Sequence, residues 1–188
     1  MIKIVITGSI ASGKTTASKI LSYKRGPLFS ADNEIKKLYQ NNNFKGRLIK
    51  KFNIKKKSNL KNIIKKKIFE DSGNIKKLEK IIHPLVRKKM KNFSIKYKKK
   101  IKLFYEIPLL FENKLTKYFD VIIFIKANNK IRLKRFMARG GNKNLFTFLN
   151  KRQLPDNKKM RLSDHVVINE KNYNILKKNL LDIIKLYE

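Results

Sequence analysis

Close to its N-terminus the chain carries the segment Gly8-Ser9-Ile10-Ala11-Ser12-Gly13-Lys14-Thr15. This segment matches the pattern G-x-x-x-x-G-K-[ST] at every fixed position. The glycines let the backbone wrap, so that successive N–H groups and the N-terminus of the following helix point at a β-phosphate. Lys14 then reaches the β- and γ-phosphate oxygens, and Thr15 holds Mg²⁺. The segment predicts a phosphate-binding loop, and we expect Thr16 to contact the nucleotide as well.

The residues on either side of this loop provide the context that it requires. Ile2 to Thr7 form a short, nearly all-apolar run, which is typical of a strand buried on both faces of a parallel sheet. A helix is expected to start near Lys14. A second strand at 28–31 leads to Asp32, a plausible N-cap for a helix from 33 to about 40. The chain therefore begins as a βαβ unit.

Residues 45–100 have a different pattern, because their apolar residues recur among lysines at helical spacings. These apolar residues are Leu48, Phe52, Leu60, Ile63, Ile64, Ile68, Leu78, Ile81, Ile82, Leu85, Val86, Met90 and Phe93. We interpret the segment as a helical lobe. The lysine runs at 55–57, 65–67 and 98–100 are expected to be solvated helix faces or ends, with anion contacts as the alternative.

Strand character returns at 101–107 and 121–125, and a helix is expected from 128 to about 138, before a flexible break at Gly140-Gly141. A loop with a short helix follows over 142–152. The chain closes with a strand at 165–168 and an amphipathic helix at 171–187. Strands that alternate with helices predict a three-layer α/β fold with a parallel sheet of about five strands. We expect one domain over 1–188, with the helical lobe at about 45–100 and a lid at about 138–155.

The composition is strongly basic, with a formal net charge of +35 and a pI near 10.4. Lys, Asn and Ile together make up 85 of the 188 residues, and these are the residues of A/T-rich codons. We attribute most of the charge to codon bias, since a selected DNA-binding protein usually relies on arginine. A basic nucleic-acid-binding protein stays the alternative, although no recognised nucleic-acid motif occurs. The chain has no cysteine, which fits a reducing compartment.

Further motifs occur along the chain in a fixed order. They are Ser30-Ala31-Asp32, His83-Pro84-Leu85-Val86-Arg87, Glu106-Ile107-Pro108-Leu109-Leu110-Phe111-Glu112, Arg135 with Arg139, Gln153, and Ser163-Asp164-His165-Val166-Val167-Ile168-Asn169. In order and spacing, these motifs resemble dephospho-coenzyme A kinases over residues 1–169. The resemblance implies a P-loop kinase with a helical substrate-binding lobe and an arginine-bearing lid. Such an enzyme uses ATP and Mg²⁺ to phosphorylate the ribose 3′-hydroxyl of dephospho-coenzyme A, the last step of coenzyme A biosynthesis.

Asp32 is the residue that we expect to accept or orient the proton of the acceptor hydroxyl. It follows the second strand, where the carboxyl ends of parallel strands gather around a ligand, and it matches the family's catalytic aspartate. A plain helix cap is the alternative, and one residue can serve as both. The family usually has Asp-Ala-Asp, whereas this chain has Ser30 in the first place, which weakens any role for that position.

Glu106 follows an apolar run, at the position from which a Walker-B carboxylate points at the Mg²⁺ shell. Relatives more often have Asp there, so a hydrogen bond to the phosphate-binding loop is the alternative. The resemblance implies that His83 and Arg87 border the acceptor site, with Arg87 one helical turn on and able to bind a phosphate. The residues alone also allow His83 to be the N-cap of a helix that begins with Pro84.

Pro108, Leu109 and Glu112 are expected to bind the acceptor or to shape the loop around it. Arg135 and Arg139 share one helix face with Arg132, because the three are spaced three and four apart. The resemblance implies that Arg135 and Arg139 are lid arginines that close over the transferred phosphate. Arg139 is the stronger candidate for a catalytic role, beside Lys14 and Asp32. Asn169 is expected near the adenine, with a plain turn residue as the alternative.

A nucleoside monophosphate kinase or a sugar kinase would share the loop and the lid, but the 83–87 and 108–112 motifs count against both. We therefore expect ATP and Mg²⁺ as cofactors and dephospho-coenzyme A as the small-molecule partner. We expect no specific nucleic acid, no membrane association and a cytoplasmic monomer or weak homo-oligomer. No run of apolar residues is long enough to span a bilayer.

Overall fold

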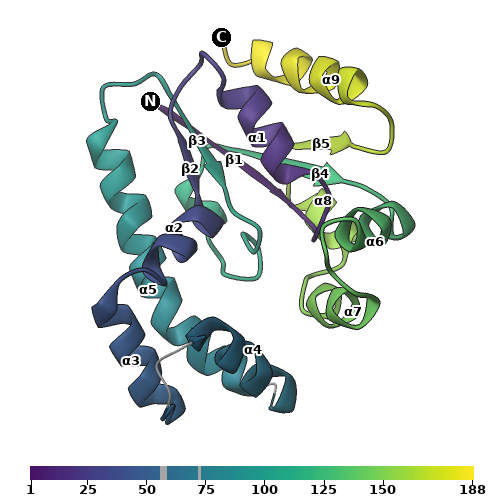
Figure 1. Cartoon of the computed structure of the whole chain (residues 1–188). Coiled ribbons are helices and arrows are strands. Elements are labelled where there is room, and N and C mark those ends of the chain that lie inside the picture. Colours follow the sequence, from purple (N-terminus) through teal and green to yellow (C-terminus); the bar gives the residue numbers. More distant parts are fainter. Residues whose placement is uncertain (56–58, 72) are drawn as a thin grey trace. The chain divides into compact units, whose positions relative to one another are not determined.

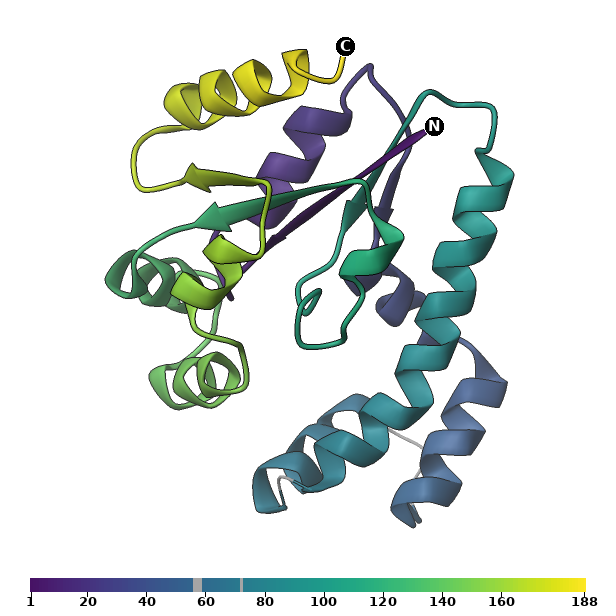
Figure 2. The same ribbon diagram turned by 180° about the vertical axis from the view of Figure 1, so that it is seen from behind.

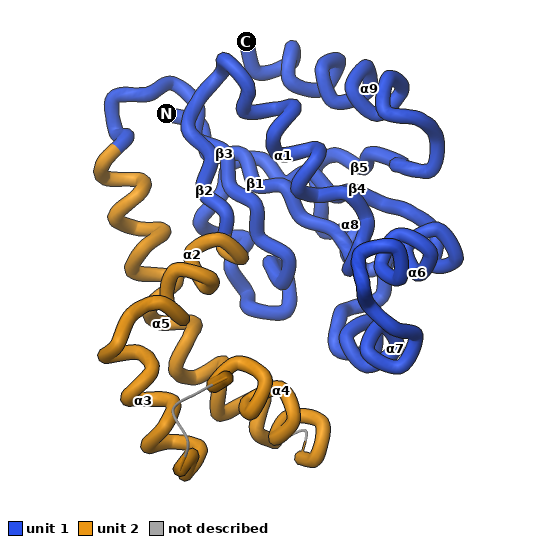
Figure 3. The backbone as a smooth tube through the Cα atoms, in the orientation of Figure 1, with its two compact units in different colours: residues 1–30, 97–188 blue, residues 31–96 orange. Residues whose placement is uncertain are grey.

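The computed structural model describes residues 1–55, 59–71 and 73–188. The chain divides into two compact units, which Figure 3 colours separately. The first unit consists of residues 1–30 and 97–188, and the second consists of residues 31–96. Each unit has a hydrophobic core of its own. The second unit begins earlier than the lobe expected at about 45–100, because one more helix belongs to it.

The first unit alternates strands with helices, as Figure 1 and Figure 2 show from opposite sides. Its strands are β1 (Ile2–Gly8), β2 (Leu28–Ser30), β3 (Lys102–Glu106), β4 (Val121–Lys126) and β5 (His165–Ile168). Its helices are α1 (Lys14–Ser22), α6 (Asn129–Met137), α7 (Lys143–Lys151), α8 (Asp156–Arg161) and α9 (Tyr173–Lys185), with a short 3-10 helix at Thr116–Tyr118. The strands lie where the apolar runs predicted them.

The strands form one sheet in the order β2-β3-β1-β4-β5, and all neighbouring strands are parallel. The central strand β1 pairs Ile6 with Glu106 of β3 on one side and with Ile123 of β4 on the other. The glycine-rich loop therefore leaves the sheet at its carboxyl edge, between two neighbouring strands, where open α/β sheets bind ligands. The predicted α/β fold with a five-stranded parallel sheet is confirmed.

Burial on both faces of the sheet explains why β1 is almost entirely apolar. Ile4 and Ile6 are fully buried in a core that residues of α1 and α9 complete, and Figure 1 shows both helices on this face. Val5 is also fully buried, although side chains alternate along a strand and Val5 therefore points to the opposite face. A strand with no solvent-facing side keeps the start of the loop in a fixed place.

In its described residues the second unit consists of the helices α2 (Ala31–Leu38), α3 (Asn42–Phe52), α4 (Leu60–Glu70) and α5 (Gly73–Lys96). Apolar residues from three of these helices form its core: Phe44, Leu48 and Phe52 from α3, Leu60 and Ile64 from α4, and Ile81 and Ile82 from α5. The side chain of Asn41 caps α3 by accepting a hydrogen bond from the Phe44 N–H at 3.0 Å. The helical spacing of these apolar residues thus reflects a packed core.

The expected start of α2 is wrong by a small shift. The helix begins at Ala31, so Asp32 lies in its first turn and is not its N-cap. A carboxylate in the first turn still interacts favourably with the positive end of the helix dipole, which explains why an acidic residue suits the position. The Asp32 side chain is exposed.

The interpretation of His83 as a helix N-cap is wrong as well. Helix α5 continues through this position, with Pro84 inside it. A proline in a helix removes one backbone hydrogen bond and crowds the preceding turn. Ile81 and Ile82 before the proline and Val86 after it pack against the same core, and this favours one continuous helix.

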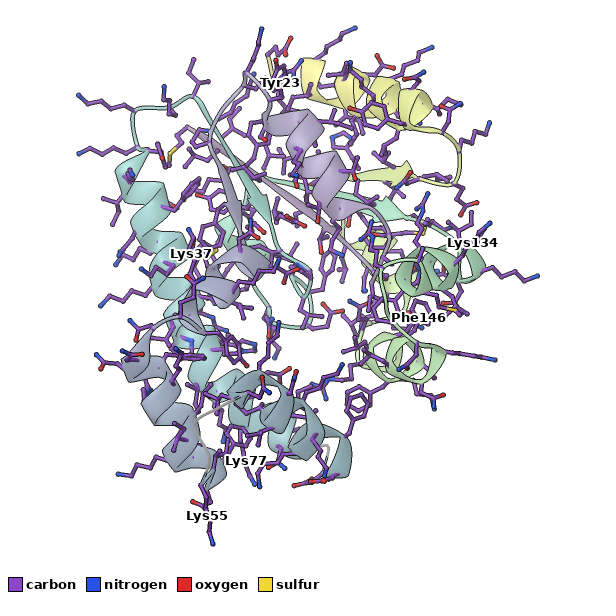
Figure 4. All side chains as sticks on the ribbon, in the orientation of Figure 1. Tyr23, Lys37, Lys55, Lys77, Lys134 and Phe146 are labelled. Carbon is purple, nitrogen blue, oxygen red and sulfur yellow. The ribbon has the colours of Figure 1, made fainter. Side chains whose placement is uncertain are left out.

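Lysine side chains account for much of the surface of both units. Lys37, Lys55, Lys77 and Lys134, which Figure 4 labels, are all exposed, as is usual for lysine. Lys56 and Lys57, which complete the expected solvated run at 55–57, lie outside the described residues. Within the described ranges, no helix is both long enough and apolar enough to cross a membrane.

The position of His83 inside α5 predicts a pH dependence of stability. Burial lowers the pKa of His83 below its ordinary value of 6.5; Glu79 raises this pKa and Arg87 lowers it. As the pH falls through 6.5, the unfolded chain therefore binds the proton before the folded chain does, and the free energy of unfolding decreases. His83→Gln should lose less stability than the wild type between about pH 7.5 and about pH 5.5, measured by urea denaturation. Both proteins keep His165, so the comparison isolates position 83. A difference between their free energies of unfolding that stays constant over this pH range would contradict the prediction.

Candidate active site

The glycine-rich loop joins the end of β1 to the start of α1. Lys14 is buried, and its Nζ donates a hydrogen bond to the backbone oxygen of Ser9 at 3.1 Å. The hydroxyl of Ser12 is buried and has no hydrogen-bond partner among the described residues. Leaving a buried hydroxyl unpaired costs free energy, and an anion bound in the loop would remove that cost. The loop is thus suited to a phosphate group.

The two residues expected to bind the metal lie in contact. Thr15 Oγ1 donates a hydrogen bond to Glu106 Oε1 at 2.5 Å. Glu106 is the last residue of β3, lies opposite Ile6 in the parallel register and is buried. Hydroxyl and carboxylate oxygens are ligands that Mg²⁺ prefers, so this pair fits the ion.

Asn169 follows β5 directly and contacts the loop. Its Nδ2 donates a hydrogen bond to the backbone oxygen of Ser12 at 2.8 Å, and its own backbone oxygen accepts one from Arg135 Nη1 at 3.0 Å. Gly13 has a φ of 101°, and a Cβ on this residue would collide with the Asn169 side-chain amide. Both the backbone conformation and the close approach of Asn169 therefore require glycine at position 13.

The second expected lid arginine, Arg139, is placed differently from Arg135. It follows the end of α6, and its side chain is exposed, whereas Arg135 is half-buried. Gly140 comes next with a φ of 82°, a left-handed conformation that glycine adopts readily. Among the described residues, the structure gives the Arg139 side chain no contact with the phosphate-binding loop.

The connection after β3 holds the residues expected to bind the acceptor in the first unit. Thr7 Oγ1 donates to the backbone oxygen of Pro108 at 3.4 Å, and Leu109 is half-buried beside it in the chain. Glu112 Oε1 accepts a hydrogen bond from the backbone N–H of Leu154 at 2.9 Å. The connection is therefore attached both to the central strand and to the segment that precedes α8.

The other residues expected at the acceptor site belong to the second unit. Asp32 lies on α2, and His83 and Arg87 lie one turn apart on α5. Helices α2 and α5 pack against each other. Burial lowers the pKa of His83, and the positive charge of Arg87 nearby lowers it further.

Some residues that contact the loop were not assigned from the sequence. The backbone N–H of Ile10 donates to Gln153 Oε1 at 2.8 Å, and its backbone oxygen accepts a hydrogen bond from Arg132 Nη1 at 3.4 Å. Arg132 is buried and also donates to Asn150 Oδ1 at 2.8 Å. Both polar groups of the Ile10 residue are thus bound by the protein. The three-and-four spacing of the arginines marked Arg132, but it did not distinguish a buried residue from lid residues.

Lys159 and Asp156 of α8 also contact the loop, through the Ser9 hydroxyl. No feature of the sequence distinguishes Lys159 from the other 39 lysines of the chain. Asp156 follows Pro155 at the start of a short helix, where an acidic residue is common for reasons of capping and dipole alone. Only the folded structure shows that both reach the loop.

Comparison with known proteins places these features in a family. A family model described as dephospho-CoA kinase matches residues 2–174. The chain belongs to the dephospho-CoA kinase family. The dephospho-CoA kinase of Bartonella quintana is 34% identical over 187 residues, covering 97% of this chain and 96% of the relative. That of Rickettsia typhi is 33% identical over 192 residues, covering 98% of this chain and 97% of the relative.

Solved structures agree with this dephospho-CoA kinase assignment. The dephospho-CoA kinase from Campylobacter jejuni aligns with a TM-score of 0.71 at 25% identity, over 98% of this chain and 96% of that chain. A shikimate kinase from Aquifex aeolicus aligns with a TM-score of 0.56 at 19% identity, over 99% and 98% of the two chains, which is a similarity of fold alone. As a dephospho-CoA kinase, the chain is an ATP-dependent phosphotransferase.

The contact between Gly13 and Asn169 gives a test of the loop. Gly13→Ala should weaken ATP binding by about tenfold or more, because a left-handed alanine costs about 1–2 kcal/mol and its methyl group would displace Asn169. Calorimetric titration with ATP measures the change. Gly46→Ala is the matched control, since nothing lies within 4 Å of a Cβ there, and it should stabilise α3 by about 1 kcal/mol. Equal ATP affinity in both variants would mean that the loop does not bind the nucleotide in this conformation.

Proposed function

We propose that this dephospho-CoA kinase transfers the γ-phosphoryl group of ATP to the ribose 3′-hydroxyl of dephospho-coenzyme A. The observation that carries the proposal is the phosphate-binding loop, in which Lys14 is buried against Ser9 and Thr15 is hydrogen-bonded to Glu106. The family match over residues 2–174 supports the acceptor. The fold alone would not select it, since a shikimate kinase shares the fold.

The loop is suited to bind the phosphates of ATP. Its backbone N–H groups and the N-terminus of α1 offer donors and a positive dipole end. Lys14 exchanges the Ser9 carbonyl for β- and γ-phosphate oxygens when ATP binds, and it neutralises the charge that develops there. Asn169, which is hydrogen-bonded to the loop, and Arg135, which is hydrogen-bonded to Asn169, border the rest of the nucleotide in this proposal.

Magnesium fits the same part of the site. Among the described residues, no group of three or more His, Cys, Asp or Glu side chains could hold a metal by itself. Mg²⁺ in kinases usually takes one or two protein oxygens and completes its coordination with waters and phosphates, so Thr15 and Glu106 are sufficient. When bound, the ion would neutralise charge on the β- and γ-phosphates.

The acceptor hydroxyl needs a carboxylate, and we assign that role to Asp32. In the transfer, the 3′-oxygen forms a bond to the γ-phosphorus while the bond from this phosphorus to the bridging oxygen breaks, and ADP leaves with the electron pair. The carboxylate of Asp32 orients the hydroxyl in line and accepts its proton late in the step, because the transition state is loose. The proton then passes to solvent.

Cationic and loop residues complete the proposed site. His83 and Arg87 are suited to bind the acceptor, and the arginine can pair with its phosphate groups. Pro108, Leu109 and Glu112 border the acceptor in this proposal. Arg139 acts from the lid on the transferred phosphoryl group, and its exposed position after α6 leaves its side chain accessible.

The reaction is tested by screening ATP consumption against possible acceptors. Dephospho-coenzyme A should support turnover, whereas nucleoside monophosphates, simple sugars and shikimate should leave the rate near the acceptor-free background. Excess chelator should abolish turnover, and Mg²⁺ should restore it. Mass spectrometry of the product should show one added phosphoryl group. Turnover with one of the other acceptors, and none with dephospho-coenzyme A, would refute the proposal.

Asp32→Asn tests the role of the carboxylate. Asparagine keeps the shape of the side chain but cannot accept the proton, so kcat with dephospho-coenzyme A should fall by about 10² to 10⁴. ATP affinity and the melting temperature should stay near those of the wild type, because the side chain is exposed and lies in the first turn of α2. Asn33→Asp, the exposed neighbour, serves as the control for the surface of α2. An equal loss in acceptor-free ATP hydrolysis would place Asp32 on the nucleotide side instead.

The remaining expectations from the sequence stay predictions. They are the lid at about 138–155 within one domain over 1–188, a monomer or weak homo-oligomer, a cytoplasmic location and the absence of a specific nucleic-acid partner.

A further inference from the structure

Four charged residues form two ion pairs that reach the phosphate-binding loop, and only one of them, Glu112, has a role in the proposed function. Lys159 on α8 is 1% exposed, and Arg132 on α6 is 5% exposed. Glu112 Oε1 lies 3.4 Å from Lys159 Nζ, and Asp156 Oδ2 lies 3.9 Å from Arg132 Nη2. We name these four residues the charge cluster; its two cations are buried, and its two carboxylates are half-buried. It contains two cations and two carboxylates and is therefore balanced.

The cluster holds the Ser9 hydroxyl in one orientation. Lys159 Nζ donates a hydrogen bond to Ser9 Oγ at 3.0 Å, so this oxygen accepts from the ammonium. Ser9 Oγ in turn donates a hydrogen bond to Asp156 Oδ1. Because one bond uses a lone pair of the hydroxyl and the other uses its proton, the side chain of Ser9 is held from both directions.

Ser9 also links this cluster to the lysine of the phosphate-binding loop. The backbone oxygen of Ser9 accepts the hydrogen bond from Lys14 Nζ, while its hydroxyl accepts the one from Lys159. In the part of the chain that the structure describes, Lys14 and Lys159 are the two buried lysines, and both donate to Ser9. A shift of Ser9 would therefore move a binding partner of Lys14.

Burying a lysine ammonium is unfavourable unless its charge is compensated. Lys159 Nζ lies 6.0 Å from the centroid of the Phe124 ring in the middle of β4, a strand of the buried sheet. Burial lowers the pKa of Lys159, while Glu112 and Asp156 raise it. Apolar residues in place of the whole cluster would avoid the desolvation cost, so stability alone does not explain a charged group here.

We propose that Lys159 is a positioning residue for phosphoryl transfer, which acts through the hydroxyl of Ser9 to hold the phosphate-binding loop and Lys14 in place. Its ammonium does not touch the nucleotide. The role is geometric: a misplacement of about 1 Å in a catalytic group can cost about 10²-fold in rate. This inference rests on the proposed function for the identity of the acceptor, but its geometry concerns only the nucleotide side.

The first test compares Lys159→Met with Lys158→Met, the exposed neighbour on the same helix. Methionine keeps the apolar stem in the core and removes the charge. For Lys159→Met we expect kcat per folded molecule to fall about 10- to 100-fold, with the KM for dephospho-coenzyme A changed by less than about twofold. Lys158→Met should keep kcat within about twofold of the wild type.

A second variant, Ser9→Ala, tests the same link even if the Lys159→Met protein fails to fold. It removes one hydroxyl and leaves Lys159 beside Glu112 and Asp156, so the buried ammonium stays paired. We expect kcat to fall by about tenfold. In the double variant the two losses in kcat should not multiply, because both substitutions break the same link. The kcat of the double variant should stay within about twofold of that of the less active single variant.

Two results would overturn the proposal. A lower melting temperature with unchanged kcat per folded molecule in both single variants would make Lys159 a structural residue only. Losses that multiply in the double variant would show that Lys159 and Ser9 act independently. If dephospho-coenzyme A is not the acceptor, the wild type fails with it, and acceptor-free ATP hydrolysis then serves as the readout, with the same loss expected in Lys159→Met.

Discussion

The backbone hydrogen bonds that hold β1 between β3 and β4 determine where every group of the nucleotide site lies. The parallel register sets Ile6 opposite Glu106, so the residue that ends β3 emerges beside the loop that follows β1. From there Glu106 accepts the hydrogen bond from Thr15. On the other side, β4 pairs with β5, and Asn169 at the end of β5 reaches Ser12. A strand buried on both faces is what allows these separate segments to meet reproducibly.

Burial, rather than charge, separates the two lysines to which we assign a role from the rest. The chain has a net charge of +35, and most of its lysines are solvated. Desolvating an ammonium is costly, so a lysine is buried only where carboxylates, carbonyls or hydroxyls compensate it. In the described residues this occurs at Lys14 and Lys159, which share Ser9 as a partner. A basic composition therefore carries little information about the site until burial is known.

Much of the fold and part of the site could be predicted from the sequence, because they depend on local patterns. The apolar run of β1 and the glycine spacing after it are such patterns. The N-cap assignments were wrong at Asp32 and His83, because the ends of a helix depend on which of its residues are buried in the folded protein. Burial of Ile81 and Ile82, for example, favours an α5 that continues through Pro84. Lys159 could not be found at all, since its partners come from distant segments of the chain.

The two hydrogen bonds to Ile10 have a consequence for the segment of chain between Arg132 and Gln153. Arg132 binds its carbonyl and Gln153 binds its N–H, so both polar groups of one loop residue are tied to the two ends of the segment that contains α7. The chain between these two residues therefore forms a closed loop, and Arg135 within it is held as well, by the backbone oxygen of Asn169. Substitutions on the surface of α7 leave the two anchor points unchanged. An insertion or deletion between them instead changes the length of chain that has to connect two fixed points, so it should disturb the phosphate-binding loop more than a surface substitution does.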